Sequence, residues 1–354
     1  MRQGNAMLPS AAALHALPRA LLLLPGLALV SALAVRLMIV IGVQDRPDPR
    51  KAHRTPMPKA GGVGIVAAFV LGVQLHGAPG LRAALPAILL MAAMALLDDL
   101  LTLGFMPKLL AQLAAGLVAL AAGFGLHRLS LPLIGPLALG GLGAPLTMVF
   151  WLGLTNAMNF IDGLNGLAAG VTLMAALALA GAGALAGEAA LTGGGLLLAG
   201  AVLGFLPFNF PRARIFMGDV GSQFCGFMLG LLGVVAARAA VPPVSALLVP
   251  LLLSGVLFDV GFTLIRRLLA GEHIARAHNG HLYQVAARSG VNARAVALLH
   301  WGFAGLGGAC ALALPYASAS RGAGLLGLVL LVQLIWAGFV VRRARQARLG
   351  RWSV

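Results

Sequence analysis

The chain has 354 residues, of which 60% are hydrophobic and 10% are charged, and its 25 lysines and arginines outnumber nine acids. Soluble domains carry about 25% charged residues, so this composition excludes an ordinary soluble protein. The net charge of +16 would suggest nucleic-acid binding in a soluble chain, but here long apolar runs separate the basic segments. Basic loops beside membrane spans set orientation and meet anionic headgroups, so we expect a lipid bilayer and no nucleic acid as partner. Cys225 and Cys310 lie in apolar runs and show neither a disulfide nor a metal-site spacing.

In chain order, the apolar runs predict about eleven transmembrane helices, most of them long enough for a hydrocarbon core of roughly 30 Å. We expect them at residues 20–43, 61–80, 82–97, 107–126, 144–161, 165–186, 189–209, 220–239, 244–265, 294–314 and 322–341. The predicted fold class is all-α, a polytopic integral membrane protein. Its single transmembrane domain covers residues 20–341, preceded by an N-terminal extension over 1–19 and followed by a basic tail over 342–354.

The lysines and arginines alternate between successive loops. Eighteen lie in one set of loops, which includes the C-terminal tail, and six lie in the other set together with the N-terminus. The remaining one, Arg36, lies inside the first predicted span. The positive-inside rule then places the N-terminus outside and the C-terminus in the cytoplasm.

The acids are distributed unevenly on this topology. Eight of the nine lie in or near the predicted cytoplasmic loops, and only Glu188 lies on the other side. Acidic residues contribute little to orientation, so the topology rule does not explain this bias. A functional site at the cytoplasmic face would explain it.

The first polar motif is Asp98-Asp99, which follows the short run at 82–97. Neighbouring side chains on a helix point about 100° apart, so both carboxylates cannot serve one small site unless the helix frays. Such a pair is unfavourable beside the membrane unless cations neutralise it. We interpret it as a metal-binding or acid–base pair, and the alternative is an interfacial pair hydrated by water.

The second motif runs from Asn156 to Ala168. Asn156 and Asn159 are three residues apart and share a helix face, and Asp162 follows after one more such step. Gly163 allows a backbone or a ligand to approach closely. Amide and carboxylate oxygens suit a hard cation or the edge of a uracil base. The alternative is a capped helix end.

The third motif runs from Phe216 to Ser222 and contains Asp219 between glycines, where a loop enters the span at 220–239. An Asp at this position is suited to capping the helix. The same position suits a metal ligand, with free backbone N–H groups nearby for phosphate.

Two further motifs are basic. The loop at 266–294 contains His278 and His281, which suit a diphosphate better than zinc because no further ligand pattern accompanies them. The segment from Asp45 to His53, which includes Lys51, would attract an anionic lipid or a lipid phosphate. The alternative for the basic residues is topology determination alone.

Together, these motifs resemble those of the polyprenyl-phosphate N-acetylhexosamine-1-phosphate transferases, known as glycosyltransferase family 4. Four of them carry the resemblance, in the family's order and at its span ends: Asp98-Asp99, Asn156–Ala168, Phe216–Ser222 and the loop from His281 to Gln284. The resemblance implies transfer of a HexNAc-1-phosphate from a UDP-N-acetylhexosamine to undecaprenyl phosphate, with release of UMP. It also implies Mg²⁺ as cofactor, with Mn²⁺ as an alternative. The expected location is the bacterial cytoplasmic (inner) membrane, with the active site on the cytoplasmic face.

Within the family, the chain looks less like phospho-MurNAc-pentapeptide translocase. That branch has a Thr-Pro-Thr-Met-Gly-Gly segment and consecutive histidines, where this chain has Pro58–Gly62 and His278–Gln284. The spacing from His53 to Gly62, and Asp259 in the ninth span, resemble the branch that starts O-antigen, common-antigen or teichoic-acid chains. The Tyr-Gln ending resembles O-antigen initiators of Gram-negative bacteria. We therefore expect initiation of a cell-surface polysaccharide such as lipopolysaccharide O-antigen, with peptidoglycan synthesis as the alternative.

Carried over residue by residue, the resemblance assigns Mg²⁺ to Asp219 with Asp162. It assigns the lipid phosphate to Asp98, with Asp99 assisting, and a phosphate contact to His281 as a further catalytic residue. The substrate-binding residues that it implies are Lys51, His53, Asn156, Asn159, Asp162, Asp259 and His278. Direct attack by the lipid phosphate and a covalent phosphosugar on an Asp both remain open.

Other classes of protein compete with this interpretation. A transporter would show repeats and acids near the membrane midplane, whereas the acids here lie at one face. A CDP-alcohol phosphatidyltransferase requires an Ala-Arg after its Asp-Gly, whereas Ala168-Ala169 follows Asp162-Gly163 here. A non-catalytic lipid scaffold is the third alternative. The sequence does not fix the sugar, the polysaccharide or whether the chain forms a homodimer.

Overall fold

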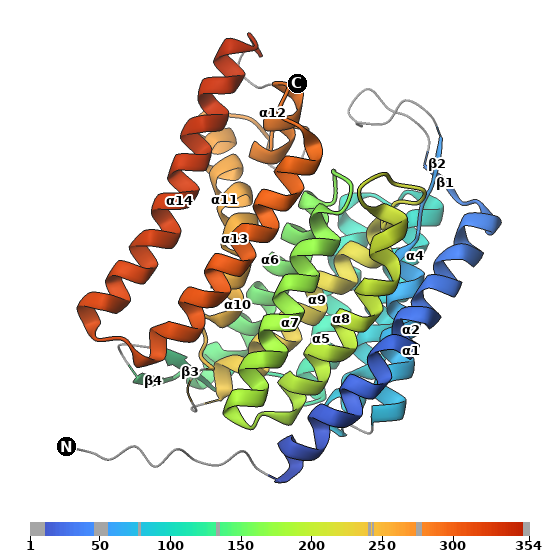
Figure 1. The fold of residues 1–354 in the computed structure, drawn as a ribbon, viewed down its shortest axis with the longest axis vertical. Coiled ribbons are helices and arrows are strands. Elements are labelled where there is room, and N and C mark those ends of the chain that lie inside the picture. The colour runs from blue at the N-terminus through green and yellow to red at the C-terminus, as the bar shows by residue number, and fades with distance from the viewer. Residues whose placement is uncertain are drawn as a thin grey trace.

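The computed structural model describes residues 11–45, 56–76, 79–131, 135–239, 242, 244–273 and 278–349. Its helices run up and down in a bundle (Figure 1). They are α1 (Ala11–Ile41), α2 (Gly62–His76), α3 (Pro79–Ala83), α4 (Leu85–Leu101), α5 (Phe105–Ala121), α6 (Gly143–Ile161), α7 (Leu167–Ala186), α8 (Ala189–Asn209), α9 (Gly218–Arg238), α10 (Leu248–Leu252), α11 (Ser254–Leu269), α12 (Leu282–Arg288), α13 (Ala293–Ala313) and α14 (Ala319–Gln346), with short 3₁₀ turns at Gly140–Leu142 and Leu314–Tyr316. Two antiparallel hairpins pair β1 (Gln44–Asp45) with β2 (Met57–Pro58), and β3 (Arg128–Leu131) with β4 (Gly135–Ala138).

Seven stretches of the described chain form helices long and apolar enough to cross a membrane. They are Leu21–Ile41, Gly140–Ile161, Leu167–Ala186, Ala189–Asn209, Gly218–Arg238, Ala293–Tyr316 and Ala319–Gln346. The protein is therefore a multi-pass membrane protein. The other predicted spans fall on shorter helices, namely α2, α4, α5 and the pair α10–α11. The number of crossings and the orientation in the membrane accordingly stay predictions.

The structure corrects the all-α prediction in detail while confirming a mostly helical fold. Two short hairpins accompany the helices. The predicted span at 244–265 is divided, because α10 ends at Leu252 and α11 begins at Ser254. The loop at 266–294 contains α12, a short helix that the sequence analysis did not foresee.

Helix α9 is almost entirely buried, and small residues allow its neighbours to approach closely. A β-carbon at Gly226 would lie 2.6 Å from the carbonyl oxygen of Leu154 in α6. Next to this contact, Trp151 of α6 packs edge-on against Phe227, with ring centroids 5.6 Å apart. Lipid tails are as apolar as the side chains of membrane helices, so no hydrophobic driving force holds such helices together. They typically associate through small residues, which allow close packing. This packing fixes α9 in the centre of the bundle, with Asp219 in its first turn.

The polar segments gather at one end of the bundle. The hairpin β1–β2 and helix α12 lie at this end, and the hairpin β3–β4 lies at the other (Figure 1). Helices α4 and α6 both end where α9 begins, as the contacts of Asp99 and Asn159 with the first turn of α9 show. The up-and-down course of the chain therefore brings motifs that are far apart in the sequence to a single place.

Candidate active site

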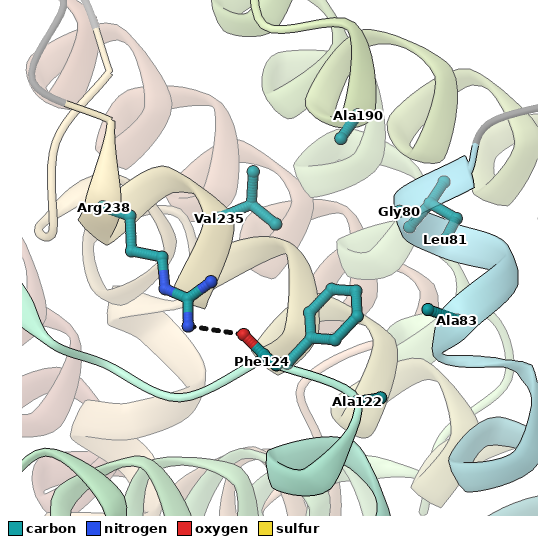
Figure 2. Close-up of a pocket in the computed structure, with 9 residues that line it drawn as sticks. Gly80, Leu81, Ala83, Ala122, Phe124, Ala190, Val235 and Arg238 are labelled. Atoms are coloured by element: carbon teal, nitrogen blue, oxygen red, sulfur yellow. Dashed lines mark hydrogen bonds between the residues drawn. The ribbon is translucent and has the colours of Figure 1, made fainter.

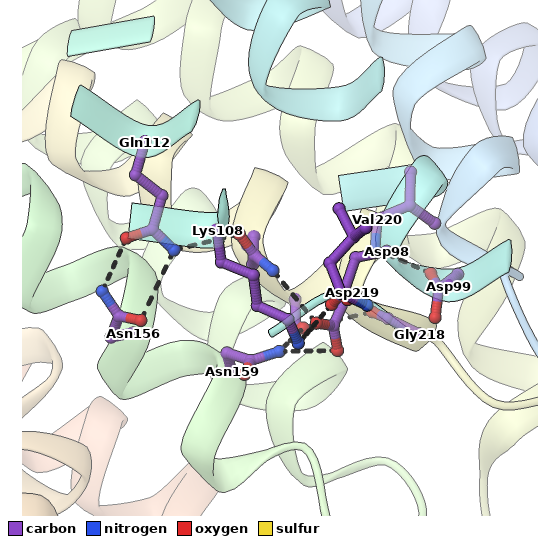
Figure 3. Close-up of polar contacts among 12 residues, drawn as sticks. Asp98, Asp99, Lys108, Gln112, Asn156, Asn159, Gly218, Asp219 and Val220 are labelled. Carbon is purple, nitrogen blue, oxygen red and sulfur yellow. Dashed lines mark hydrogen bonds and ion pairs between the residues drawn. The ribbon is translucent and has the colours of Figure 1, made fainter. Parts of the chain in front are cut away.

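The two neighbouring aspartates of α4 have different partners (Figure 3). The helix continues through both residues, so their side chains diverge as an unbroken helix requires. The carboxylate of Asp98 accepts a hydrogen bond of 2.7 Å from Leu103 N and contacts Lys108. The carboxylate of Asp99 faces α9 and accepts a hydrogen bond of 3.0 Å from Val220 N. Both aspartates are buried.

Lys108, in the first turn of α5, lies between two carboxylates (Figure 3). Its ammonium group contacts Asp98 and lies 3.0 Å from Oδ2 of Asp219. A buried carboxylate requires a compensating cation, and a single lysine here serves two acids from different helices. Lys108 thus joins the ends of α4, α5 and α9.

Asp219 is held by side-chain amides on both of its oxygens. Asn159 Nδ2 donates to Oδ1 over 3.0 Å, and Gln223 Nε2 donates to Oδ2 over 3.1 Å. Asn159 also donates to Ser222 Oγ over 3.0 Å. With 25% of its side chain exposed, Asp219 is the most accessible of the three carboxylates that Lys59 and Lys108 contact. Its position is fixed, yet its oxygens can still be reached from outside.

A chain of amides continues from Asp219 into the bundle (Figure 3). Gln112 of α5 donates over 3.0 Å to Gln223 of α9. Asn156 of α6 donates to Gln112 over 2.8 Å and receives a longer hydrogen bond of 3.4 Å in return. Gln112 and Gln223 are buried. Buried amides in an apolar bundle are costly unless they bond to one another, so this chain links three helices beneath the carboxylates.

The segment before α2 pairs with the segment before α9. Phe216 N donates to Pro58 O over 2.8 Å, Gly61 N donates to Phe216 O over 3.0 Å, and Gly62 N donates to Met217 O over 2.8 Å. These backbone hydrogen bonds extend the edge of β2 toward α9. They place the residue that follows Pro58 directly beside the carboxylates.

That residue is Lys59, whose ammonium nitrogen lies 3.8 Å from Oδ1 of Asp99. Glycine is required where α9 meets Asp99: Gly218 has φ +75°, and a β-carbon on it would lie 2.6 Å from the Asp99 carboxylate. At the next turn, a β-carbon at Gly221 would lie 2.8 Å from the Cα of Gly62. Lys59 and Asp219 therefore lie on two segments in direct backbone contact.

Asp162 follows the last turn of α6 and is half-buried. Burial raises its pKa well above the usual value, and the negative charges of Asp219 and Asp99 raise this pKa further. Among the described residues, no lysine, arginine or histidine forms an ion pair with it. A cation held beside this carboxyl would lower its pKa again. Carboxylate oxygens such as those of Asp162 and Asp219 are the ligands that a hard divalent ion such as Mg²⁺ prefers.

The small number of acidic side chains also agrees with the usual coordination of Mg²⁺. Within the ranges that the structure describes, no three histidine, cysteine or acidic side chains are arranged to hold a metal by themselves. Mg²⁺ usually takes one or two carboxylates and completes its shell with water and substrate phosphates. Two carboxylates, such as those of Asp162 and Asp219, would match this preference.

His281 stands at the start of α12 and rests on Asp259 of α11. The distance from Nδ1 of His281 to Oδ1 of Asp259 is 3.0 Å, and both side chains are buried. Asp259 also accepts hydrogen bonds from Leu282 N and Tyr283 N. The structure thus places Asp259 beneath the histidine, away from any surface that a substrate would touch.

One aromatic contact and one hydrogen bond connect this loop with α6. His281 packs against His278, with ring centroids 4.9 Å apart, and against Phe160, with centroids 5.7 Å apart. The hydroxyl of Tyr283 donates to Phe160 O over 2.9 Å, just before Asp162. Burial lowers the pKa of His278 to about 4, and His281 and nearby arginines lower it further. The histidine loop therefore meets the carboxylate end of α6.

The remaining sequence-predicted residues lie elsewhere. Lys51 and His53 fall outside the residues that the structure describes. Glu272, an acid of the predicted loop at 266–294, forms an ion pair of 2.8 Å with Arg267. A cavity of about 250 Å³ (Figure 2) is lined by Val235 and Arg238 of the last turn of α9, the end of this helix opposite Asp219. Its lining includes Arg238, which donates to Gly123 O over 2.7 Å.

A family model described as Glycosyl transferase family 4 matches residues 81–237, which include Asp98, Asn159 and Asp219. A relative from Bacillus subtilis (strain 168), described as a probable undecaprenyl-phosphate N-acetylglucosaminyl 1-phosphate transferase, is 31% identical over 260 residues, or 72% of each chain. This chain belongs to glycosyl transferase family 4.

Other relatives of this family 4 protein show the range of its family. A decaprenyl-phosphate N-acetylglucosaminephosphotransferase from Mycobacterium leprae (strain TN) is 32% identical over 315 residues, or 78% of this chain and 77% of the relative. A phospho-N-acetylmuramoyl-pentapeptide-transferase from Leuconostoc citreum (strain KM20) is 32% identical over 203 residues, or 52% of this chain and 63% of the relative. The resemblance deduced from the motifs is thus confirmed.

Sequence reasoning missed several polar residues of this family 4 site. Lys108 was counted only as a loop charge, and Gln112 and Gln223 were not considered. All three interrupt strongly apolar helices. A polar side chain inside a membrane helix is costly and is therefore a usable signal.

Proposed function

We propose that the protein transfers a HexNAc-1-phosphate from a UDP-N-acetylhexosamine to undecaprenyl phosphate, giving the lipid-diphosphate sugar and UMP. The observation that carries this proposal is the convergence of Asp98, Lys108, Asn159 and Asp219 at one end of the bundle. The names of the relatives support a polyprenyl phosphate and an N-acetylglucosamine phosphate as substrates. The product would start a cell-surface polysaccharide, for which lipopolysaccharide O-antigen is our proposal.

In this reaction an oxygen of the lipid phosphate attacks the β-phosphorus of the UDP-sugar. A new bond forms between that oxygen and the phosphorus, the bond to the bridging oxygen breaks, and UMP leaves with the electron pair. Transfer of this kind depends mainly on positioning and on neutralising negative charge. The site offers both, because its cations and amides are fixed by contacts with three helices.

Lys108 and Lys59 would bind the phosphates. Each ammonium group lies beside a carboxylate, at 3.0 Å between Lys108 and Asp219 and at 3.8 Å between Lys59 and Asp99. A substrate phosphate would compete for the same donors, and a lysine has three of them. Asn159 keeps the Asp219 carboxylate oriented before any substrate arrives.

Asp219 and Asp162 would hold Mg²⁺, with Mn²⁺ as an alternative. Bound there, the ion would neutralise the diphosphate and the charge that develops on the leaving UMP. His281, at the neighbouring loop, would contact a phosphate oxygen from the other side.

We propose direct attack by the lipid phosphate in place of a covalent phosphosugar on an Asp. Asp98 has one oxygen bonded to Leu103 N and contacts Lys108. Asp99 bonds to Val220 N through one oxygen, and its other oxygen lies nearest Lys59. These contacts hold both carboxylates beside the two lysines that would bind the phosphates. We therefore assign Asp98 to positioning the lipid phosphate and accepting its proton, with Asp99 assisting.

The charge of the loops supports a cytoplasmic site. Eighteen of the 25 lysines and arginines lie in the loops that accompany the carboxylates. By the positive-inside rule this end faces the cytoplasm, where UDP-sugars are made available. The proposed location is the bacterial inner membrane.

The test is UMP release by the purified protein in lipid nanodiscs with undecaprenyl phosphate, Mg²⁺ and one UDP-sugar at a time. The panel contains UDP-GlcNAc, UDP-GalNAc and UDP-MurNAc-pentapeptide. We expect release with a UDP-N-acetylhexosamine, and formation of a lipid-diphosphate sugar in equal amount. Release with the pentapeptide substrate alone would favour the alternative, peptidoglycan synthesis, and would agree with the name of the phospho-N-acetylmuramoyl-pentapeptide-transferase from Leuconostoc citreum. If none of the three UDP-sugars led to UMP release, the proposal would be contradicted.

A further inference from the structure

Asp259 is buried in the ninth predicted span, yet four donors surround its carboxylate. Oδ1 accepts hydrogen bonds of 3.0 Å from Leu282 N and 3.3 Å from Thr263 Oγ1, and Oδ2 accepts one of 2.9 Å from Tyr283 N. The fourth partner is Nδ1 of His281, 3.0 Å from Oδ1. Asp259 has 0% of its surface exposed, so a substrate cannot reach it. Its function must be exerted through these partners.

The chemistry of a carboxylate decides the state of the histidine ring. An ionised carboxylate only accepts hydrogen bonds, so the 3.0 Å contact with Asp259 favours the tautomer in which Nδ1 of His281 carries the hydrogen. In the neutral ring, Nε2 is then the unprotonated nitrogen. It lies on the opposite edge of the ring from Nδ1 and so points away from Asp259 and α11.

Other contacts fix the ring in the remaining directions. His278 stacks on His281 with an interplanar angle of 26°, and Phe160 lies on α6 with its centroid 5.7 Å away. Gln284 accepts a hydrogen bond of 3.3 Å from the backbone N of His281. The ring is therefore packed against His278 and Phe160, and the backbone of His281 is anchored by Gln284.

We propose that Asp259 is a positioning residue that fixes the tautomer and orientation of His281, so that Nε2 is presented to a substrate phosphate. This inference rests on the proposed transfer reaction, in which His281 contacts phosphate. The simpler alternative is that Asp259 only anchors the first turn of α12 through Leu282 and Tyr283. In the first role, Asp259 affects activity only through the imidazole of His281. In the second role, it affects activity whether or not the imidazole is present.

A double-mutant cycle separates the two roles. In Asp259→Asn the remaining oxygen can still accept from Tyr283 N, while an NH2 group at the place of Oδ1 would donate to Nδ1 and favour the wrong tautomer, at the cost of the hydrogen bond from Leu282 N. Loss of that backbone hydrogen bond persists when His281 is replaced, so the cycle separates it from the effect on the ring. We expect kcat for UMP release to fall about 10- to 100-fold, with a smaller change in KM. In the His281→Gln background, we expect Asp259→Asn to cost less than about twofold more. Independent effects that multiply in the double variant would overturn the proposal, and so would unchanged activity of Asp259→Asn.

A matched control changes the same carboxylate without touching the histidine. Thr263→Val removes one donor to Oδ1 and leaves His281 in place. We expect a loss of less than about threefold, because one neutral hydrogen bond is lost. A loss as large as that of Asp259→Asn would indicate a general role of the carboxylate in stability, and would count against the proposal.

A second measurement does not depend on activity or on the folding of an Asp259 variant. Nitrogen-15 NMR of the histidine-labelled wild-type protein reports which nitrogen of each neutral ring carries hydrogen. The His281 signal is identified by its loss in His281→Gln. We expect the Nδ1–H tautomer once the ring is neutral, and an Nε2–H tautomer would overturn the inference. If the wild type released no UMP but showed the expected tautomer, only the proposed function would fail.

Discussion

The ammonium group of Lys108 contacts the Asp98 carboxylate and lies 3.0 Å from Oδ2 of Asp219. One cation therefore bridges the end of α4 and the start of α9, two segments that enclose the proposed phosphate site. In the proposed reaction, the same ammonium would turn from the carboxylates to the oxygens of a bound diphosphate.

Replacing Lys108 by Gln should reduce kcat about 100-fold or more, because a fixed positive charge at the transferring phosphate is lost. Lys108→Arg should retain more activity, since the charge remains although its geometry changes. The measurement is steady-state UMP release at saturating UDP-sugar. Arg294→Gln, at an exposed site at the start of α13, removes an equal charge and serves as control. Equal losses in both variants would argue against a role for Lys108 at the site.

Asp219→Asn should abolish the response of activity to Mg²⁺, with a loss of about 100-fold or more at any metal concentration. The neutral amide keeps the size of the side chain but removes the charge that the cation needs. Titration of UMP release with Mg²⁺ and with Mn²⁺ measures this effect. Glu272→Gln, which neutralises an acid paired with Arg267, should leave the metal titration unchanged. Undiminished Mg²⁺-dependent turnover by Asp219→Asn would exclude the residue as a ligand.

Replacing the buried amides Gln112 and Gln223 should reduce activity less than Asp219→Asn does, and the two replacements should act on the same interaction. Gln223→Leu removes one donor to Asp219, and Gln112→Leu leaves Gln223 and Asn156 without their common partner. We expect each variant to raise the Mg²⁺ concentration needed for half-maximal activity, and to lower stability by about 1–3 kcal/mol. In the double variant, the loss of stability should be smaller than the sum of the two single losses, because neither glutamine is left without its partner. Additive losses would show that the two amides act separately.

A close contact between two loops predicts a compensating pair of substitutions. A β-carbon at Gly163 would overlap the Tyr283 hydroxyl and lie 3.1 Å from its Cζ atom. Gly163→Ala should therefore displace α12 and lower both thermal stability and activity. Tyr283→Phe alone should cost about 1 kcal/mol, since its hydrogen bond to Phe160 O is lost. Combined with Gly163→Ala, it should restore part of the loss, and a double variant worse than Gly163→Ala would contradict the packing.

The low pKa of His278 predicts how stability depends on pH. Burial lowers this pKa from 6.5 to about 4, so the folded protein keeps the ring neutral where the unfolded chain binds a proton. The resulting stability is fully present above pH 6.5 and is lost as the pH falls toward 4. We expect the unfolding temperature of wild type to fall more between pH 7 and pH 5 than that of His278→Gln. Parallel curves for the two proteins would exclude this cause.

Much of the architecture followed from the sequence because the bilayer imposes it. Apolar runs marked the helices, and the distribution of charges gathered the acids at one end. The adjacent pair Asp98-Asp99 diverges as helix geometry required. Pairings between distant segments did not follow, because periodicity contains no information about which helices touch. The contact of Lys108 with Asp219 spans 111 positions of the chain, and only packing reveals it.

The same limitation applies to Asp259. Its place in a predicted span suggested a functional acid, and the resemblance implied contact with a substrate. The structure instead surrounds it with donors from a short helix that begins 23 positions later in the chain. Helix α12 has seven residues, too few for a clear helical period in a loop rich in glycine and basic side chains.

The contact between Gly62 and Gly221 sets a limit on how this protein can vary. At this crossing a single hydrogen atom on each residue separates the segment that carries Lys59 from the segment that carries Asp219, because no room remains for a methyl group. A larger side chain at either position would push the two segments apart, and with them the ammonium group of Lys59 and the carboxylate of Asp219. The distance between the two charges is therefore encoded by residues that have no charge and no side chain.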